Sequence, residues 1–286
     1  MFQSNIWLRA GAVLAALSCG GQARADEKAD ALIKQVTAAY ANVKTLSGTL
    51  TKIETHTRSD RNFLRGVTTE QIELKLPAFA YIVTEKKVKG HGRVFGADYT
   101  EHYTRVADDK TIWVFDGGIN HYNHFINWGV ENAVLIGYSS LMIGESSILM
   151  SEFYTPVSFS PLIERTNSPN PDLKRIVERH CAGKTKYHGV LCDVVEQNSK
   201  VYDKQQRHPY TSKTRFYIGP DKLLRGYSSK EDIPPTTYRH LHLTETSEEY
   251  IVDLKVNQDI PDSRFIFTPP AGATLDASLE DNLGDL

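Results

Sequence analysis

The stretch QIELKLPAFAYIV, residues 71–83, decides the fold of this chain. In its first half Ile72, Leu74 and Leu76 alternate with polar side chains, and a second apolar run follows the proline. An apolar residue at every second position indicates a β-strand with one face buried and the other face in water. The stretch therefore predicts neighbouring strands of an antiparallel sheet that is covered on one side.

Strand signals recur on both sides of this stretch. The chain holds 14 Tyr and 11 Phe, and β-branched residues share the same runs, a composition that favours strands over helices. The GPDK sequence at 219–222 predicts a hairpin turn between two of the runs. Strands are predicted at residues 45–57, 67–76, 80–87, 99–106, 111–115, 172–181, 190–200, 212–218, 223–230, 239–243 and 248–256.

Three segments depart from the strand pattern. Residues 26–46 place apolar side chains at helical spacing and predict one amphipathic helix that packs one apolar stripe on another part of the protein. Residues 260–273 form an extended closing segment, and the acidic residues 274–286 predict a solvated tail. The run 132–150 is long, almost uncharged and without a period of two, which favours short apolar helices. These helices either plug one end of a barrel or form a movable lid over an apolar cavity.

The first 25 residues predict an export signal. Arg9 supplies a positive region, an apolar run too short to span a bilayer follows, and Ala23-Arg24-Ala25 is a small-x-small cleavage site. Cleavage after Ala25 would release a soluble periplasmic protein that begins at Asp26. The alternative is a lipoprotein, because Ala16-Leu17-Ser18-Cys19 loosely matches a lipidation box with Cys19 as the anchor.

Cys181 and Cys192 are the two cysteines after this signal, and an oxidising compartment favours a disulfide between them. The intervening residues 182–191 contain glycine turn signals between two alternating runs, so the two sulfurs are predicted to meet across a hairpin. The competing interpretation, a metal or redox pair, lacks the close spacing of such sites.

The composition excludes several functions. The whole chain has a net charge of −2, and removal of the signal takes away Arg9 and Arg24, so the exported chain carries −4 and shows no nucleic-acid footprint. Gly144-Glu145-Ser146 lacks the second glycine of a nucleophile elbow, and no phosphate-cradling glycine loop is present. Two histidine pairs, His121 with His124 and His240 with His242, lack a clear third metal ligand. We therefore predict no catalytic residues, no metal and no cofactor.

Five motifs, taken in order, resemble the LolA/LolB-type lipoprotein-carrier superfamily and the lipoprotein-sorting-like proteins grouped with it. They are TLSGTLTKIET at 45–55, QIELKLPAFAYIV at 71–83, DKTIWVFDGGINHYNHF at 109–125, CAGKTKYHGVLCDVVE at 181–196 and IPDSRFIFTPPAGA at 260–273. The third is similar to a family hairpin, and the last to the family's closing signature. The carriers use an arginine before the proline of the second motif to latch their lid, and Leu76 stands there in this chain.

The resemblance implies an α+β fold that is mainly antiparallel β: an unclosed, half-pipe β-barrel with an N-terminal helix and short lid helices over an apolar cavity. Residues 1–25 would be the signal, 26–273 a single domain with a lid insert at about 131–165, and 274–286 the tail. The cavity would hold a hydrophobic ligand such as the acyl chains of a lipoprotein or another lipid, since burial of each CH₂ contributes about 0.8 kcal/mol.

The predicted function is a non-enzymatic periplasmic carrier or chaperone of such a ligand. The alternative is an envelope sensor of the RseB type that signals to a membrane protein. The candidate cavity residues, each of which would equally suit an ordinary core, are Ile72, Leu74, Leu76, Trp113, Phe115, Leu141, Met142, Leu149 and Met150.

Overall fold

A computed structural model describes residues 26–58, 61–76, 78–90, 98–126, 173–203, 210–234 and 242–276. The predicted signal at 1–25, the box at Cys19 and the predicted lid at 131–165 lie outside these residues, as do Leu141, Met142, Leu149 and Met150. No helix of the described ranges has both the length and the apolar character needed to cross a membrane.

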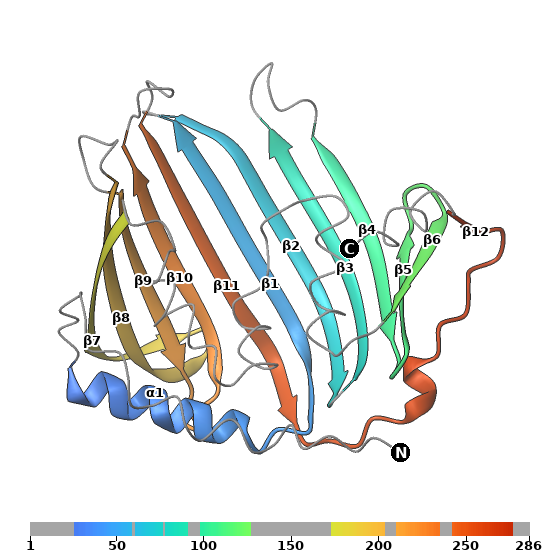
Figure 1. The fold of residues 1–286 in the computed structure, drawn as a ribbon, viewed down its shortest axis with the longest axis horizontal. Coiled ribbons are helices and arrows are strands. Elements are labelled where there is room, and N and C mark those ends of the chain that lie inside the picture. Colours follow the sequence, from blue (N-terminus) through green and yellow to red (C-terminus); the bar gives the residue numbers. More distant parts are fainter. Residues whose placement is uncertain are drawn as a thin grey trace.

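The described strands form one sheet of twelve (Figure 1). Its order is β12-β6-β5-β4-β3-β2-β1-β11-β10-β9-β8-β7, and the sheet stays open between its edge strands β12 and β7. All neighbouring strands are antiparallel except β12 and β6. The strands are β1 (Thr45–Arg58), β2 (Arg61–Lys75), β3 (Phe79–Gly90), β4 (Tyr99–Ala107), β5 (Thr111–Asp116), β6 (His121–Ile126), β7 (Leu173–Tyr187), β8 (Val190–Asp203), β9 (Tyr210–Ile218), β10 (Leu224–Ile233), β11 (Leu243–Val256) and β12 (Thr274–Leu275). The predicted unclosed antiparallel half-barrel is confirmed.

Helix α1 (Glu27–Tyr40) lies across the ends of strands β7 to β11 (Figure 1). Asp26 caps it by accepting the Lys28 N–H at 3.0 Å, and its apolar stripe is buried on the sheet. At 1.5 Å per residue the helix is about 21 Å long, whereas the longest strands, of 15 residues, reach about 50 Å. Helix α1 therefore covers only one end of the sheet, and it stops earlier than the predicted 26–46 because Thr45 already belongs to β1.

The two faces of the sheet carry different side chains. We call the face under α1 the helix face and the opposite face the outer face. Apolar side chains of the helix face and of α1 form one contiguous buried cluster, which runs from Ile112 on β5 to Val195 on β8. A second, smaller cluster lies around Tyr187 and Tyr217 of the outer face, whose rings stack at 3.7 Å.

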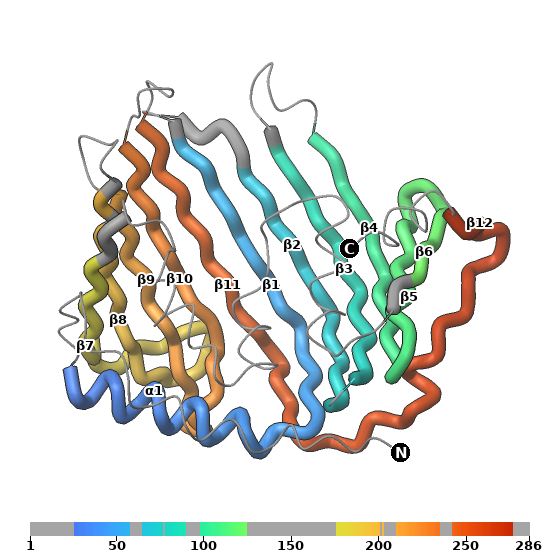
Figure 2. Tube along the Cα trace, viewed as in Figure 1, coloured from blue at the N-terminus to red at the C-terminus, as the bar shows by residue number. Residues whose placement is uncertain are grey.

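The C-terminal segment runs from the end of β11 past the short helix η1 (Asp262–Phe265) to the edge strand β12 (Figure 2). In β12, Thr274 and Leu275 pair in parallel with His121 and Tyr122 of β6. The predicted tail at 274–286 thus begins with a strand, and the residues from 277 onward lie outside the described ranges.

Most predicted strands are present with small differences at their ends. Strand β6 was not among the predicted strands. The resemblance of the motif at 109–125 to a hairpin is confirmed, because β5 and β6 form one. Of the strand predicted at 239–243, residues 239–241 fall outside the described ranges, and β11 begins at Leu243.

Candidate ligand-binding site

The described members of the predicted cavity lie on both faces of the sheet. Ile72 and Leu74 are buried in the helix-face cluster, and Leu76 packs against it half-buried. Trp113 and Phe115 occupy the alternate positions of β5 and point to the outer face, because Ile112 and Val114 take the helix face. These five side chains therefore do not line one common cavity.

The helix face beyond the end of α1 is apolar across four strands, β2 to β5. Leu74 faces Ala80, Ala80 faces Ala107 and Ala107 faces Ile112, while Ile72 faces Ile82 in the next row. All of them are at most 2 % exposed. We call this set the apolar strip: Ile72, Leu74, Ala80, Ile82, Ala107 and Ile112. Sequence reasoning found Ile72 and Leu74 from their alternation but missed the alanines, which have no period-two signal of their own.

A buried charged cluster adjoins the apolar strip on the same face. Glu70 on β2 accepts hydrogen bonds from Thr84 Oγ1 at 2.9 Å and from Arg105 Nη2 at 2.5 Å, and Arg105 also donates to Thr84 at 3.0 Å. Glu70 and Arg105 are each 2 % exposed. Burial of a lone charge is costly, so the two ions hold each other in place. The helix face is thus apolar at one end and ionic next to it.

Buried polar side chains continue along the helix face toward β11. Lys52 on β1 pairs with Glu54 at 2.8 Å, and its register neighbours are Thr68 on β2 and Glu249 on β11. Burial raises the pKa of the neighbouring Tyr227 well above its ordinary value of 10.0, so this phenol stays protonated. The polar region can therefore offer both hydrogen-bond donors and charges to a ligand.

The C-terminal segment covers part of the outer face. Arg264 donates to Glu73 from Nε at 2.7 Å and from Nη2 at 3.2 Å, and its guanidinium lies 3.9 Å from the centre of the Tyr81 ring. Phe265 packs on Phe79, with ring centres 5.5 Å apart. The bonds to Glu73 raise the pKa of Arg264 further above its ordinary value.

Trp113 is covered by the same segment. Phe267 stacks on the Trp113 ring at 5.3 Å, and Tyr122 of β6 packs on both rings. Trp113 is therefore part of the packing that fixes the C-terminal segment to the sheet. The aromatic residues of the motif RFIFTPP indicated that this segment packs on the protein. No sequence pattern indicated that Trp113 would be its partner.

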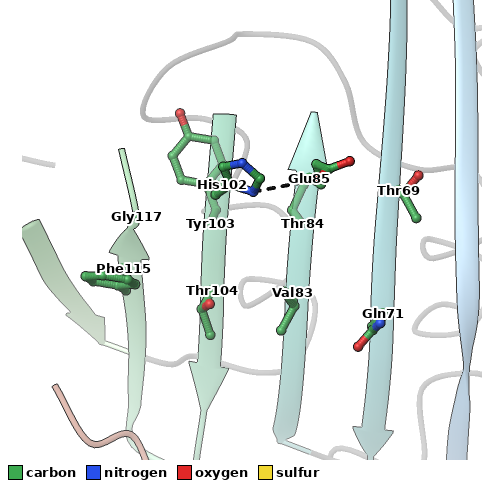
Figure 3. A pocket seen from close by; sticks show the side chains of 10 residues that line it. All are labelled: Thr69, Gln71, Val83, Thr84, Glu85, His102, Tyr103, Thr104, Phe115 and Gly117. Atoms are coloured by element: carbon green, nitrogen blue, oxygen red, sulfur yellow. Dashed lines mark ion pairs between the residues drawn. The ribbon is translucent and has the colours of Figure 1, made fainter. Parts of the chain in front are cut away.

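Phe115 instead lines a hollow of about 360 Å³ on the outer face of β2 to β5 (Figure 3). Gln71, Val83 and Thr104 form its floor beside Phe115. Glu85 lies at its rim next to His102, and the hydrogen bond from Lys87 holds the pKa of Glu85 below its ordinary value. The hollow is polar and its charges already have partners.

The other end of the outer face has a larger hollow, of about 640 Å³, across β7 to β10. Three lysines line it, Lys200, Lys213 and Lys230, together with Glu178 and polar neighbours. Sequence reasoning missed this hollow because its residues come from four strands and form no motif along the chain.

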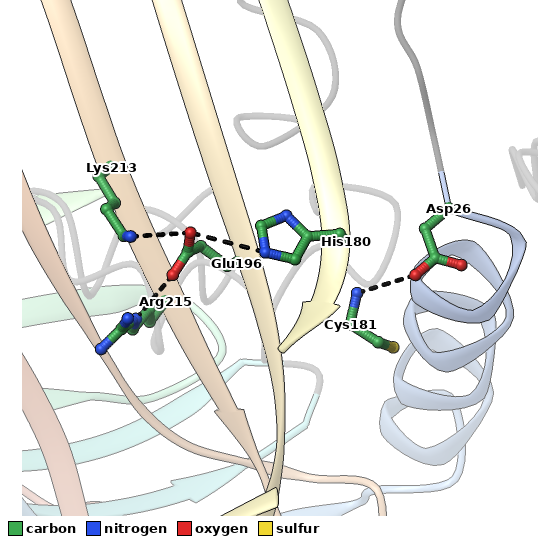
Figure 4. A network of polar contacts seen from close by, with 6 residues as sticks. All are labelled: Asp26, His180, Cys181, Glu196, Lys213 and Arg215. Carbon is green, nitrogen blue, oxygen red and sulfur yellow. Dashed lines mark hydrogen bonds and ion pairs between the residues drawn. The ribbon is translucent and has the colours of Figure 1, made fainter. Parts of the chain in front are cut away.

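An ionic network borders the larger hollow (Figure 4). Glu196 accepts from Arg215 Nε at 2.8 Å and pairs with Lys213 at 2.8 Å and with His180 at 3.6 Å. Burial alone would raise the pKa of Glu196, but the hydrogen bonds from Lys213 and Arg215 outweigh it and lower this pKa below its ordinary value of 4.5. Lys213 therefore has an anionic partner inside the protein.

Asp26 ties the start of α1 to the edge strand β7 (Figure 4). Its backbone N–H donates to the Arg179 carbonyl at 3.2 Å, and its carboxylate accepts the Cys181 N–H at 3.1 Å. The bond from Cys181 is the main reason that the pKa of Asp26 is lowered. These contacts occupy backbone groups of a sheet edge that could otherwise pair with another strand.

The predicted disulfide is wrong, since Cys181 and Cys192 are free thiols. Cys181 faces Val195 and packs against the helix-face cluster, whereas Cys192 faces Thr185 and lies in the outer-face cluster. Three residues along a strand span about 10 Å, and the two side chains point to opposite faces, so no disulfide fits. The two-residue turn His188-Gly189 sets this register, with both residues at positive φ as a type I′ turn requires.

Metal binding finds no support among the described side chains. No group of three or more His, Cys, Asp and Glu there could hold an ion. The His124 ring packs at a tilt on Trp113, with ring centres 5.0 Å apart, and His242 pairs with Asp232 at 2.9 Å, so both have structural partners. His240, the expected neighbour of His242, lies outside the described ranges.

No family model matches the chain, and no curated protein does. Among solved structures, LprF from Mycobacterium bovis is similar with a TM-score of 0.40 and 9 % identity, over 82 % of this chain and 97 % of that one. A LolA superfamily protein from Nitrosomonas europaea has a TM-score of 0.30 and 9 % identity, over 84 % and 97 %. An outer membrane lipoprotein-sorting protein domain from Vibrio parahaemolyticus has a TM-score of 0.22 and 9 % identity, over 83 % and 97 %.

Proteins of the kind that the sequence motifs resemble are thus among the solved structures similar to this chain.

Proposed function

We propose that this chain is an exported, non-enzymatic carrier or chaperone that holds the apolar part of a lipid against the helix face of its open sheet. The observation that carries the proposal is the apolar strip, which continues across β2 to β5. These strands lie beyond the end of α1 (Figure 1). An acyl chain needs only a continuous apolar surface, because its binding free energy comes from lost water contact.

The position of the charged cluster supports an amphiphile over a plain hydrocarbon. Glu70 follows Ile72 as the next residue on the same face of β2, and Arg105 is the register partner of Ile82, so a lipid tail on the strip would bring its polar part close to these ions. Buried polar groups favour a ligand that can bond to them over one that cannot. Lipoprotein acyl chains and other lipids with a polar head are the ligand classes that fit an apolar strip beside a charged cluster.

Export is part of the proposal. The sequence of the first 25 residues predicts a signal, and an amphiphile crossing an aqueous compartment needs its tail shielded from water. Whether the mature chain begins at Asp26 or is anchored at Cys19 decides between a soluble carrier and a tethered receptor.

The test is recovery of bound lipid. The full chain is expressed with its own N-terminus in a Gram-negative host, purified from the envelope fraction without detergent, extracted with organic solvent and measured by mass spectrometry. We expect a stoichiometric amphiphile. Protein that yields no lipid, and that binds no fluorescent fatty-acid probe in solution, would refute the proposal.

A matched pair of variants localises the site. Ala107→Phe fills the apolar strip, whereas Ala182→Phe adds the same ring at an exposed position of β7. We expect Ala107→Phe to lower probe affinity about tenfold or more and Ala182→Phe to leave it unchanged. Circular dichroism checks that both variants fold. Equal affinities of two folded variants would place the ligand elsewhere.

A further inference from the structure

The larger hollow of the outer face contains charged side chains that form no ion pair within the described part of the chain. We call it the lysine groove: the 640 Å³ hollow across β7 to β10 that is lined by Glu178, Lys200, Tyr202, Lys213, Lys230 and Asp232. It lies on the face opposite to the apolar strip and shares no residue with it, so its role is independent of the proposed carrier function.

Two lysines of the groove oppose each other directly. Lys213 on β9 is the register partner of Lys230 on β10. Lys200 on β8 faces Thr211, two residues before Lys213, and so is a diagonal neighbour of Lys213. Like charges at such positions destabilise a sheet. Lys213 is neutralised by Glu196, so the repulsion that a bound anion would relieve is that of Lys200 and Lys230.

The internal anions near the groove already have partners. Glu196 holds Lys213 and Arg215, each at 2.8 Å. Asp232 pairs with His242 at 2.9 Å and accepts a hydrogen bond from Thr244 at 3.4 Å. These contacts leave other charges of the groove open to solvent.

Three charges of the groove form no ion pair within the described part of the chain: Lys200, Lys230 and Glu178. All three side chains are exposed. Glu178 faces Asn198, two residues before Lys200, so one anion lies diagonally beside the lysines. The open charges are thus two cations with one anion at their side.

The geometry points to a binding site for an amine-bearing phosphate ester, with its phosphate between Lys200 and Lys230 and its ammonium at Glu178. Strands β8 and β10 are two strand spacings apart, about 10 Å, and flexible lysine stems from either side can converge on one phosphate. Tyr202, 40 % exposed at the end of the groove, offers a hydroxyl and an amphipathic ring of the kind that suits a lipid headgroup region.

Such an ester has two sources, a free metabolite or the headgroup of a membrane lipid. Binding of free phosphoethanolamine, glycerol 3-phosphate and ethanolamine to the full chain is measured by calorimetry. Flotation with vesicles of phosphatidylcholine, alone or with phosphatidylethanolamine added, measures the membrane-bound form. We expect phosphoethanolamine to bind at least ten times more tightly than either of the other two small molecules.

Three variants test the residues. Lys200→Gln/Lys230→Gln removes the phosphate contacts, and Lys110→Gln/Lys186→Gln removes the same charge at exposed positions outside the groove. We expect at least a tenfold loss of phosphoethanolamine affinity for the first double variant and no change for the second. Glu178→Gln should abolish the preference for phosphoethanolamine over glycerol 3-phosphate.

Several outcomes would overturn the proposal. They are equal losses in the two double variants, equal affinity of the wild type for phosphoethanolamine and glycerol 3-phosphate, or no binding of any phosphate ester in solution or on vesicles. A melting temperature of Lys200→Gln/Lys230→Gln at or above that of the wild type would support it, because relief of repulsion should not destabilise the sheet. Vesicle binding without binding of the free ester identifies the source as membrane lipid, and the reverse identifies a free metabolite.

Discussion

The half of the sheet from β1 to β6 and the half from β7 to β11 place their charged clusters on opposite faces. The first half buries Glu70 with Arg105 on the helix face. The second half gathers Lys213 and Arg215 around Glu196 on the outer face, where both cations are half-exposed. Acidic and basic side chains are therefore shielded from water in the first half and partly hydrated in the second.

The outer faces differ as well. In the first half, the C-terminal segment covers part of the outer face through Arg264, Phe265 and Phe267. In the second half, the lysine groove leaves charges open to water. The first half thus buries its central ion pair, whereas the second half leaves Glu178, Lys200 and Lys230 exposed to water.

The largest expected effect is on the buried pair. Arg105→Met leaves the Glu70 carboxylate buried without its guanidinium and should lower the free energy of unfolding by about 3–5 kcal/mol, measured by urea denaturation. The double variant Glu70→Met/Arg105→Met should recover most of this loss, because no charge remains to be desolvated.

The matched variant in the other half is Arg215→Met, which should cost at most about 1 kcal/mol because its ion pair is partly solvated. Equal costs for Arg105→Met and Arg215→Met would break the contrast between the two halves.

The next effect concerns the cover of the first half. Phe265 is 2 % exposed, and Phe265→Ala should cost about 3 kcal/mol through lost burial and a cavity. The adjacent Ile266 is 69 % exposed, and Ile266→Ala should change stability by less than about 0.5 kcal/mol. Urea unfolding of both variants checks this. A loss at Ile266 as large as that at Phe265 would mean that the segment packs in another way.

A smaller effect is expected in the acid range from the outer-face network. Because the folded-state pKa of Glu196 is lowered below 4.5, its contribution to stability is complete above about pH 4.5 and is lost as the pH falls through the lower pKa. Below pH 4.5 the wild type should therefore lose more of its unfolding free energy than Glu196→Gln does. Thermal melts from pH 7 to pH 3 measure this difference, and parallel curves for the two proteins would contradict it.

The smallest expected effect is that of a reductant. Since Cys181 and Cys192 lie on opposite faces, dithiothreitol should leave the melting temperature of the protein unchanged. Alkylation in denaturant without reductant should modify both thiols, as mass spectrometry can show. A melting temperature that falls on reduction would show that the disulfide is present. Strands β7 and β8 would then have to pair in another register.

Much of the fold could be predicted from the sequence. Alternation at Ile72 and Leu74 located β2 and its buried face, and helical spacing located the start of α1 to within one residue but placed its end beyond Tyr40. Local patterns suffice for these elements because side-chain direction follows the backbone period. The candidate site was predictable only in part, since its apolar strip includes Ala80 and Ala107, and its charged cluster joins three strands.

The errors have one physical origin. Trp113 was expected to line the same cavity as Leu74, but a partner more than 150 residues away, Phe267, covers it on the other face. Cys181 was expected to face Cys192, but the turn at His188 sets another register and a bulge after Cys181 shifts it again. A shift of one residue moves a side chain to the opposite face, so register decides which residues meet.

The sequence by itself determined that this chain is a run of antiparallel strands behind one amphipathic helix, because the periods of two and 3.6 are written in neighbouring residues. Only the tertiary structure decided which face each strand shows to α1, which outer surface the C-terminal segment covers, and which lysines meet in one groove. These outcomes depend on pairing between residues far apart in the chain, and the energy of such pairing is set by the register and burial of the assembled sheet rather than by any local pattern.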